Sequence, residues 1–224
     1  GGDIMAVKWG SHGDYQVIAL SPWSVQEMFD LTIQAFNLSE RLRVPAFVLA
    51  EEATGHLRES VTVPEVVELY DRDYVPQEPP FGTPEPDGIP SMPSFGMGEN
   101  LMVTGSTHDE RGFRKTEGPA FHNALVRRIN QKVLSRVDEV STYESYYLDD
   151  AEQVVVAYGF TARAALRAVR QAREAGRKAG LLRLLTIWPF NDGLISGLAK
   201  PGVSFLVPEM NLGQVYSLVR AAAG

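Results

Sequence analysis

The last third of the chain alternates short apolar runs with amphipathic segments, and this alternation constrains the fold more than any other feature. The pattern predicts strands over 153–158, 179–187 and 203–207, and helices over 162–175, near 194–198 and from Gly213 onward. Strands that alternate with helices pair in parallel through right-handed crossovers. The sequence therefore predicts a parallel-sheet α/β domain over residues 151–224.

A similar but shorter pattern opens the chain. Residues 15–20 form an apolar run, and Ser24 with Glu27 three residues later is typical of a helix start. The buried face of this helix is predicted to consist of Val25, Met28, Phe29, Thr32, Ile33 and Phe36. The run 46–50 is apolar throughout, which is typical of a strand covered on both faces. Two strands and one helix make a poor sheet, so residues 1–70 are interpreted as a partial α/β domain.

Residues 71–150 differ in texture, because half of the chain's 14 prolines fall between Pro76 and Pro93. Proline lacks a backbone donor and disfavours helices and central strands, so this stretch is predicted to be an extended linker. Its predicted anchors to the surface are Phe81, Ile89, Met92, Phe95 and Met97. A connecting amphipathic helix is predicted over 121–137.

Composition excludes several classes of protein. The chain has no cysteine, so it forms no disulfide and cannot hold an iron–sulfur cluster through thiolates. A net charge of −7 disfavours sequence-independent binding to nucleic acid. No apolar run approaches the length of a membrane span and no targeting segment is visible, so a cytoplasmic location is expected.

One basic stripe departs from the acidic average. Arg163, Arg167, Arg170 and Arg173 recur at helical spacing, opposite a face rich in alanine. A solvated outer face is the favoured interpretation, because surface helices ordinarily carry charge there. Docking of an acidic partner or of a phosphate-bearing substrate is the alternative.

Two loops supply the candidate site residues. His12 lies in a glycine-containing polar loop before a strand, and His56 follows the strand 46–50, beyond whose carboxyl end open α/β sheets place their ligands. The candidate cofactor-binding or site-lining residues are Gly10, Ser11, His12, Gly13, Asp14, Thr54, Gly55 and His56. For His12, an exposed loop histidine is the plainer alternative.

Other polar clusters are given structural interpretations. His108, in the segment 107–112, suggests a metal or acid–base cluster, but adjacent residues seldom converge on one ion and no second histidine stands at ligand spacing. A turn is therefore predicted there, no metal site is predicted, and His122 is expected at the surface. The segments 159–161 and 209–214 are predicted to cap helices rather than to bind nucleotides, with Asn211 as one cap.

Six short strings occur together along nearly the whole chain. They are Gly2 to Met5 (GDIM), Trp9 to Asp14 (WGSHGD), Ser24 to Asp30 (SVQEMFD), Thr104 to Gly112 (TGSTHDERG), Arg183 to Phe190 (RLLTIWPF) and Pro208 to Gln214 (PEMNLGQ). In this order and spacing they resemble the alpha subunit of 2-oxoacid:ferredoxin oxidoreductases, in particular the 2-oxoglutarate synthase branch. Six collinear strings are far more specific than any one of them.

The resemblance implies both a fold and a reaction. The fold would be the later part of a pyrimidine-binding domain of the thiamine-enzyme type, followed by a domain like the carboxyl-terminal domain of transketolase. Thiamine diphosphate would attack the keto carbon of a 2-oxoacid, carbon dioxide would leave, ferredoxin would take the electrons and coenzyme A the acyl group. A beta subunit would share the thiamine diphosphate and Mg, partners would hold the iron–sulfur clusters, and gamma and delta subunits are further candidate partners.

Departures from the family pattern limit these expectations. The glutamate that activates the coenzyme would lie upstream of Gly1, and no complete Gly-Asp-Gly diphosphate motif occurs, so no catalytic residue is assigned. The chain is expected to be truncated at both ends and inactive alone. The alternatives are another thiamine-dependent dehydrogenase or transketolase-like subunit, which the strings at 107–112 and 188–190 disfavour, and a non-catalytic assembly module.

Overall fold

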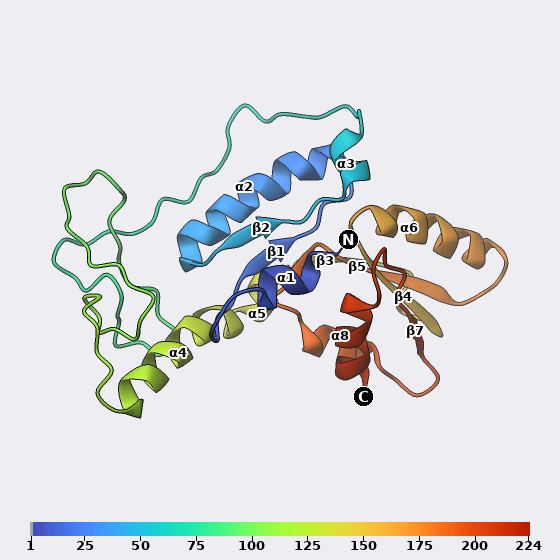
Figure 1. Ribbon diagram of the computed structural model, residues 1–224. Helices are drawn as coiled ribbons and strands as arrows, with labels where there is room; N and C mark the ends of the chain where they lie inside the picture. The colour runs from blue at the N-terminus through green and yellow to red at the C-terminus, as the bar shows by residue number, and fades with distance from the viewer. Residues whose placement is uncertain (1) are drawn as a thin grey trace.

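The structure is a computed structural model that describes residues 2–224 (Figure 1). Its helices are α1 (Ile4–Trp9), α2 (Val25–Leu42), α3 (Glu52–His56), α4 (Pro119–Leu134), α5 (Val137–Val140), α6 (Gly159–Glu174), α7 (Asp192–Leu198) and α8 (Gln214–Ala223). Its strands are β1 (Ile18–Leu20), β2 (Ala46–Val48), β3 (Tyr143–Tyr146), β4 (Gln153–Tyr158), β5 (Ala179–Leu184), β6 (Thr186–Trp188) and β7 (Ser204–Leu206). The α/β class predicted from the sequence is confirmed. None of the described helices has the length and apolar character that a membrane crossing requires.

The larger sheet has the strand order β3-β5-β4-β7. Strand β4 pairs in parallel with β5 and with β7, as the alternating pattern predicts. Strand β3 was not predicted, and it adds to the edge of β5 in antiparallel orientation, with Tyr143 opposite Leu184. The connecting region therefore ends in a strand that completes the larger sheet.

The smaller sheet has the order β2-β1-β6. Strands β1 and β2 are parallel, with Ile18 opposite Ala46, while β6 runs antiparallel to β1. The prediction of one strand over 179–187 was wrong, because the run divides at Leu185 into β5 and β6, which belong to different sheets. The partial first unit is thus extended by a strand from the last third of the chain.

The larger sheet is covered on both faces because its central strand alternates between two apolar layers. Val154, Val156 and Tyr158 point into the cluster that includes α7 and α8, whereas Val155 and Ala157 point into the cluster formed with α6. Figure 1 shows α6 and α8 on opposite sides of β4 and β5. Burial on both faces explains why these strands are continuously apolar.

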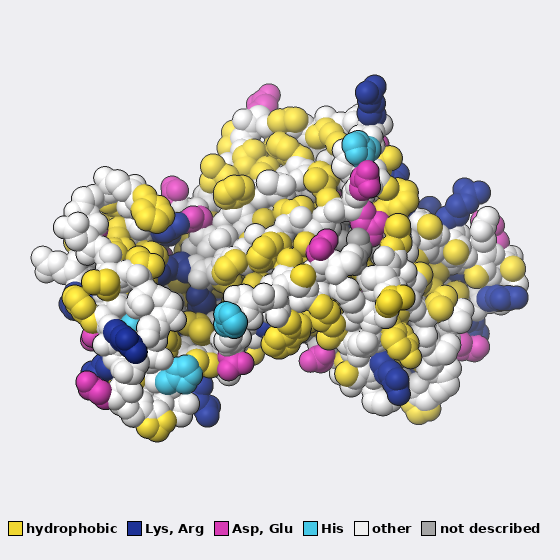
Figure 2. Space-filling view, in the orientation of Figure 1, with side chains coloured by type: hydrophobic (Ala, Val, Ile, Leu, Met, Phe, Trp, Pro, Cys, Tyr) yellow, Lys and Arg dark blue, Asp and Glu magenta, His cyan; other side chains and the backbone are white. Residues whose placement is uncertain are grey.

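Helix α2 begins where the sequence predicts, because the Ser24 hydroxyl accepts a hydrogen bond from the backbone N–H of Glu27 at 3.2 Å. Its predicted buried face was wrong. The buried residues are Leu31, Ala35, Leu38 and Leu42, while Phe36 is 68% exposed. Figure 2 shows hydrophobic side chains exposed over this helix. Strand β2 is only half-buried, so the expectation of cover on both faces was also wrong there.

One apolar cluster joins the two sheets. It contains Ile4 of α1 and Ala19 of β1, together with Val156 of β4, Leu184 of β5 and Trp188 of β6. A core that is shared in this way fixes the two sheets relative to each other, because separating them would expose buried side chains to water.

Between α3 and α4 the chain is extended, as the prolines predict, and it crosses from one end of the molecule to the other (Figure 1). Side chains of α2 hold it: Gln26 bonds the backbone of Thr62, and Asn37 bonds that of Tyr70. Of the predicted anchors, Phe81, Ile89 and Met92 are half-buried. The prediction was wrong for Phe95 and Met97, which are exposed.

Candidate functional site

A polar hollow of about 210 Å³ lies where the carboxyl ends of three strands meet. Ser21 follows β1, Glu51 lies just beyond β2, and Tyr158 ends β4; the full lining is Asp3, Ile4, Ser21, Val48, Leu49, Ala50, Glu51 and Tyr158. Open α/β sheets place ligands at such strand ends. The hollow is therefore the first candidate for a site.

A glycine allows the two sheets to approach closely at this point. Gly159 has φ +51°, and a Cβ placed on it would lie 2.9 Å from the Ser21 hydroxyl oxygen. A Cβ at this position would strain the left-handed backbone and require the Ser21 side chain to rotate, which would alter the lining of the hollow.

Two buried polar atoms beside the hollow have no partner within the described residues. They are Oε2 of Glu51, which lines it, and Oγ1 of Thr54, in the helix that Glu51 precedes. A buried polar atom without a hydrogen bond costs roughly 1–3 kcal/mol, so such atoms mark positions where a polar ligand adds stability.

Tyr158, which also lines the hollow, belongs to a hydrogen-bonded group that caps the start of α8. Its hydroxyl donates to Oε2 of Glu209 at 2.9 Å and accepts from the amide nitrogen of Asn211 at 2.9 Å. Glu209 also accepts from the backbone N–H groups of Val215 and Tyr216. Burial, and then the Glu209 carboxylate, raise the pKa of Tyr158, so its hydroxyl stays protonated and serves as a fixed donor.

The strings at the two ends of the chain meet beside this group. The side-chain oxygen of Gln214 accepts from the backbone N–H of Met5 at 2.9 Å, and its nitrogen donates to the carbonyl of Gly2 at 2.8 Å. The indole of Trp188 donates to the carbonyl of Ile4 at 2.8 Å. These contacts hold α1 against α8 and β6, next to the hollow.

Ion pairs of a buried arginine join helix α2 to the larger sheet. Arg183 of β5 has no exposed surface, contacts the carboxylate of Glu27 in α2, and bonds Glu144 of β3 at 2.9 Å. Its guanidinium lies 3.5 Å from the centre of the Trp23 ring. Glu27, whose backbone N–H bonds the capping residue Ser24, thereby ties the start of α2 to the larger sheet.

Comparisons with known proteins bear directly on this arrangement. Residues 1–128 match the family described as pyruvate flavodoxin/ferredoxin oxidoreductase, thiamine diphosphate-binding, and residues 151–224 match pyruvate:ferredoxin oxidoreductase core domain II. The chain belongs to this oxidoreductase family. The resemblance drawn from the six strings is confirmed.

Similar curated relatives carry related names. The chain is 46% identical to the 2-oxoglutarate synthase subunit KorA of Methanothermobacter thermautotrophicus over 99% of this chain and 60% of that protein. It is 49% identical to the subunit KorA of Methanocaldococcus jannaschii over 96% of this chain and 58% of that protein. The ketoisovalerate oxidoreductase subunit VorB of Methanothermobacter thermautotrophicus is 36% identical. The chain therefore spans about three fifths of the length of the first two relatives.

A solved structure shows the same fold. The 2-oxoglutarate:ferredoxin oxidoreductase from Magnetococcus marinus, determined with 2-oxoglutarate, coenzyme A and succinyl-CoA bound, superimposes with a TM-score of 0.87 at 22% identity. The match covers 99% of this chain and 40% of that one. Both sheets of this oxidoreductase-family chain thus share their arrangement with that structure.

Of the two predicted site loops of this family member, residues 12–14 line a hollow, whereas residues 54–56 are not among the lining residues of the first hollow. His12, Gly13 and Asp14 line a second hollow of about 400 Å³, together with His108 and His122, while Gly10 and Ser11 are exposed beside them. Thr54 is buried near the first hollow. Gly55 and His56 are exposed, and Nε2 of His56 lies 3.8 Å from the Glu52 carboxylate.

None of the eight residues that line the first hollow was predicted as a site residue. Ser21 and Glu51 directly follow the predicted strands 15–20 and 46–50, and Tyr158 ends the predicted strand 153–158, so the ends of the predicted strands would have named these three as candidates. For Tyr158 the signal was weaker, because an aromatic residue at the end of an apolar run resembles core.

The segment around His108 forms the turn that was predicted. Oδ1 of Asp109 accepts from the backbone N–H groups of Arg111 and Phe113, and Lys115 donates its N–H to the carbonyl of Thr107. Across residues 2–224 no three histidine, aspartate or glutamate side chains converge as metal ligands. Asn211 caps α8 as predicted, accepting from the N–H groups of Gly213 and Gln214 at 2.9 Å.

The arginine stripe of α6 is partly engaged within the chain. Arg163 pairs with Glu59 at 2.8 Å and Arg173 with Asp150 at 2.7 Å. Arg167 and Arg170 remain exposed. Half of the stripe therefore has an intramolecular role that neither earlier interpretation included.

Proposed function

We propose that this chain is part of the alpha subunit of a 2-oxoacid:ferredoxin oxidoreductase that acts on 2-oxoglutarate. The proposed reaction decarboxylates the 2-oxoacid, passes the electron pair to ferredoxin, and transfers the acyl group to coenzyme A. The observation that carries the proposal is the higher identity to two 2-oxoglutarate synthase subunits than to a ketoisovalerate oxidoreductase subunit. In this proposal the enzyme is cytoplasmic.

The proposed coenzyme is thiamine diphosphate, shared with a beta subunit. The unpaired atoms of Glu51 and Thr54 suit the polar aminopyrimidine ring, which offers both donors and acceptors. The first hollow is lined by the carboxyl groups of Asp3 and Glu51 and by no lysine or arginine among its described residues, so it suits the ring and repels a diphosphate. When bound, the coenzyme supplies the carbanion that the reaction requires.

The remaining groups are assigned to partners by the chemistry of this chain. Because it has no cysteine, iron–sulfur clusters bind to partner subunits. The diphosphate and Mg bind to the beta subunit, with gamma and delta subunits, ferredoxin and coenzyme A completing the system. Residues 10–14 and 54–56 serve as positioning segments for the substrate or coenzyme.

The proposed domains follow the same assignment. Residues 1–70 form the later part of a pyrimidine-binding-type domain, residues 71–150 connect, and residues 151–224 form a domain like the carboxyl-terminal domain of transketolase. The match of residues 151–224 to core domain II supports the last boundary.

Reconstitution tests the proposal. The full-length polypeptide, purified with its partner subunits, is assayed for ferredoxin reduction that requires both coenzyme A and a 2-oxoacid. We expect 2-oxoglutarate to exceed 3-methyl-2-oxobutanoate in kcat/KM by at least about tenfold, the value of one discriminating polar contact. Preference for the branched substrate, or turnover by residues 1–224 alone, would contradict the proposal.

A further inference from the structure

The second hollow is unusual for its charge. Three cationic side chains line it, Arg43 at the end of α2 and Arg128 and Lys132 of α4, and the histidines His12, His108 and His122 surround them. The one carboxylate in its described lining belongs to Asp14, whose negative charge interacts electrostatically with Lys8. In a chain with net charge −7, this hollow is locally basic.

The three cations are withdrawn from water without a carboxylate bonded to any of them in the described chain. Lys132 is 8% exposed, and its Nζ donates to the carbonyl of Arg43 at 2.6 Å. Burial, and then the charges of Arg43 and Arg128, lower the pKa of Lys132 to about 7. Burial, followed by Arg128, lowers the pKa of Arg43 to about 10. Buried charges are ordinarily paired, so this cluster lacks an anion.

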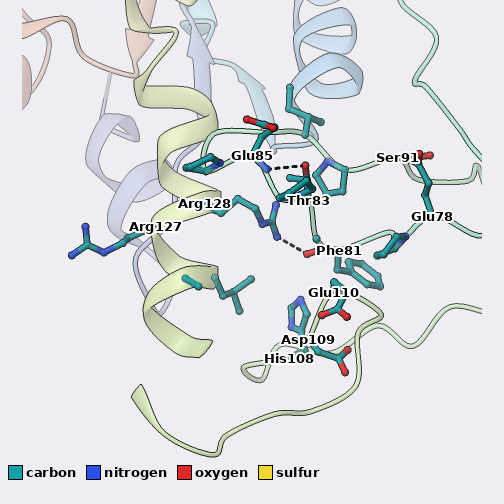
Figure 3. A pocket seen from close by; sticks show the side chains of 18 of the residues that line it. Glu78, Phe81, Thr83, Glu85, Ser91, His108, Asp109, Glu110, Arg127 and Arg128 are labelled. Atoms are coloured by element: carbon teal, nitrogen blue, oxygen red, sulfur yellow. Dashed lines mark hydrogen bonds between the residues drawn. The ribbon is translucent and has the colours of Figure 1, made fainter. Parts of the chain in front are cut away.

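The bonds that these arginines make leave donors free. Arg43 donates to the carbonyls of Pro80 and Pro90 and to Sδ of Met92, and Arg128 donates once, to the carbonyl of Phe81 at 2.7 Å. A guanidinium has five N–H donors. Arg128 lines the hollow, and its other nitrogens make no hydrogen bond to the described residues. Figure 3 shows Arg128 reaching toward Phe81, whereas Arg127 points away from it.

We propose that Arg43, Arg128 and Lys132 form a binding site for a phosphate group of a small molecule. Phosphate carries about −1.5 to −2 charges near pH 7 and several acceptor oxygens, which matches three clustered cations better than one carboxylate does. The adjoining hollow of about 820 Å³ shares Phe81, His108 and Arg128 with this one. Its lining combines apolar side chains, which include Ile89, Leu125 and Phe121, with the carboxylates of Glu78, Glu85, Asp109 and Glu110, so it suits an uncharged or partly polar remainder of the ligand and not a second phosphate.

The labelling of Lys132 by acetic anhydride tests the site directly. The full-length protein in its assembly is labelled near neutral pH with and without inorganic phosphate, and peptide mass spectrometry follows each lysine. A dianion beside Lys132 raises its pKa by at least about one unit, so saturating phosphate should slow its acetylation at neutral pH at least about fivefold. The exposed Lys178 and Lys200 should change less than about twofold, since phosphate only screens them.

Adjacent arginines supply matched variants. Arg128→Gln removes one charge-assisted contact and should raise the half-protecting phosphate concentration at least about tenfold. Arg127 is one residue away and lines the adjoining hollow but not this one. Arg127→Gln should therefore leave the half-protecting phosphate concentration within about twofold of the wild-type value. Arg128→Lys keeps the charge and controls for disturbance of the segment around Phe81 by Arg128→Gln. It should restore part of the protection of Lys132 by phosphate. Unprotected Lys132, or equal slowing at all three lysines, would overturn the proposal.

Discussion

At the scale of single residues, the fully buried arginine of β5 is held by two ion pairs and an aromatic ring. Arg183 bonds two carboxylates from elements far apart in the sequence and stacks on Trp23. Removing one partner of a buried ion pair leaves the other charge desolvated, which costs about 3–5 kcal/mol. The net value of the pair is smaller than the cost of breaking it.

We therefore expect Arg183→Met to lower the free energy of unfolding by about 3–5 kcal/mol in urea titrations. Arg177→Met, at an exposed position after α6, should change it by less than about 0.5 kcal/mol. If Arg183→Met lowers the free energy of unfolding by no more than Arg177→Met does, water must reach the ion pairs of Arg183.

Lys132 makes stability depend on pH. Because its pKa falls from 10.5 to about 7 on folding, the unfolded chain holds a proton between these values that the folded chain has released. Stability must then rise as pH increases through this window. Below about pH 7 both states are protonated and the contribution is constant.

In phosphate-free buffer, wild type should therefore gain up to about 1.4 kcal/mol per pH unit relative to Lys132→Met between about pH 7 and 9. Lys178→Met removes an exposed amine and should show no such slope. If the free energies of unfolding of wild type and Lys132→Met, measured in urea, change with pH in parallel, the result would contradict a lowered pKa of Lys132.

At the scale of elements, the turn between Thr107 and Lys115 depends on one glycine. Gly112 has φ +89°, and an added Cβ would lie 2.1 Å from the carbonyl oxygen of Met102. Gly98 has a similar φ of +84° but open space around it. The two positions separate backbone strain from steric contact.

Gly98→Ala should cost about 1–2 kcal/mol or less, the strain alone, whereas Gly112→Ala should cost more and release the turn. Hydrogen exchange of the amides from Thr107 to Lys115 measures the release. Equal hydrogen exchange of these amides in Gly98→Ala and Gly112→Ala would show that the carbonyl of Met102 moves aside and the turn stays closed.

Helix α2 shows which parts of an element can be predicted. Its start was predictable because Ser24 and Glu27 bond within one turn. Its buried face was not, since Met28, Phe29, Ile33 and Phe36 make the helix apolar on more than one side. Contact with β1 and β2 selects the face of Leu31 and Leu38, and that contact is not local.

Strands were missed for two different reasons. The sequence of β3, Tyr143 to Tyr146 (YESY), places its two tyrosines three residues apart, so it shows no period-two alternation that would predict a strand. No local signal divides β5 from β6, because Leu185 is as apolar as its neighbours. The change of sheet follows from the whole fold.

At the scale of the molecule, the candidate site combines residues from distant parts of the chain. Ser21, Glu51 and Tyr158 converge because two sheets share one core, and no spacing in the sequence encodes that convergence. The strings Gly2 to Met5 and Pro208 to Gln214 were identified correctly, but only the fold shows that Gln214 joins them.

The extended segment should be the first part of the isolated chain to yield to protease. Between Leu57 and Gly118 it has no helix or strand, and Phe95, Met97 and Met102 are exposed there. Thermolysin, which cuts before apolar residues, should cleave first within residues 94–104, as expected for exposed backbone. Initial cleavage within β4 or α6 would instead indicate that the sheets open first.

The position of β6 has a consequence for synthesis of the protein. Strand β1 lies between β2 and β6, so one of its edges stays unpaired until residues 186–188 have left the ribosome. At typical translation speeds the interval from β1 to β6 lasts roughly 10–30 s, and open strand edges invite association with other chains. In a nascent chain of this protein, one edge of β1 therefore stays open long after the first β-α-β unit has been synthesised.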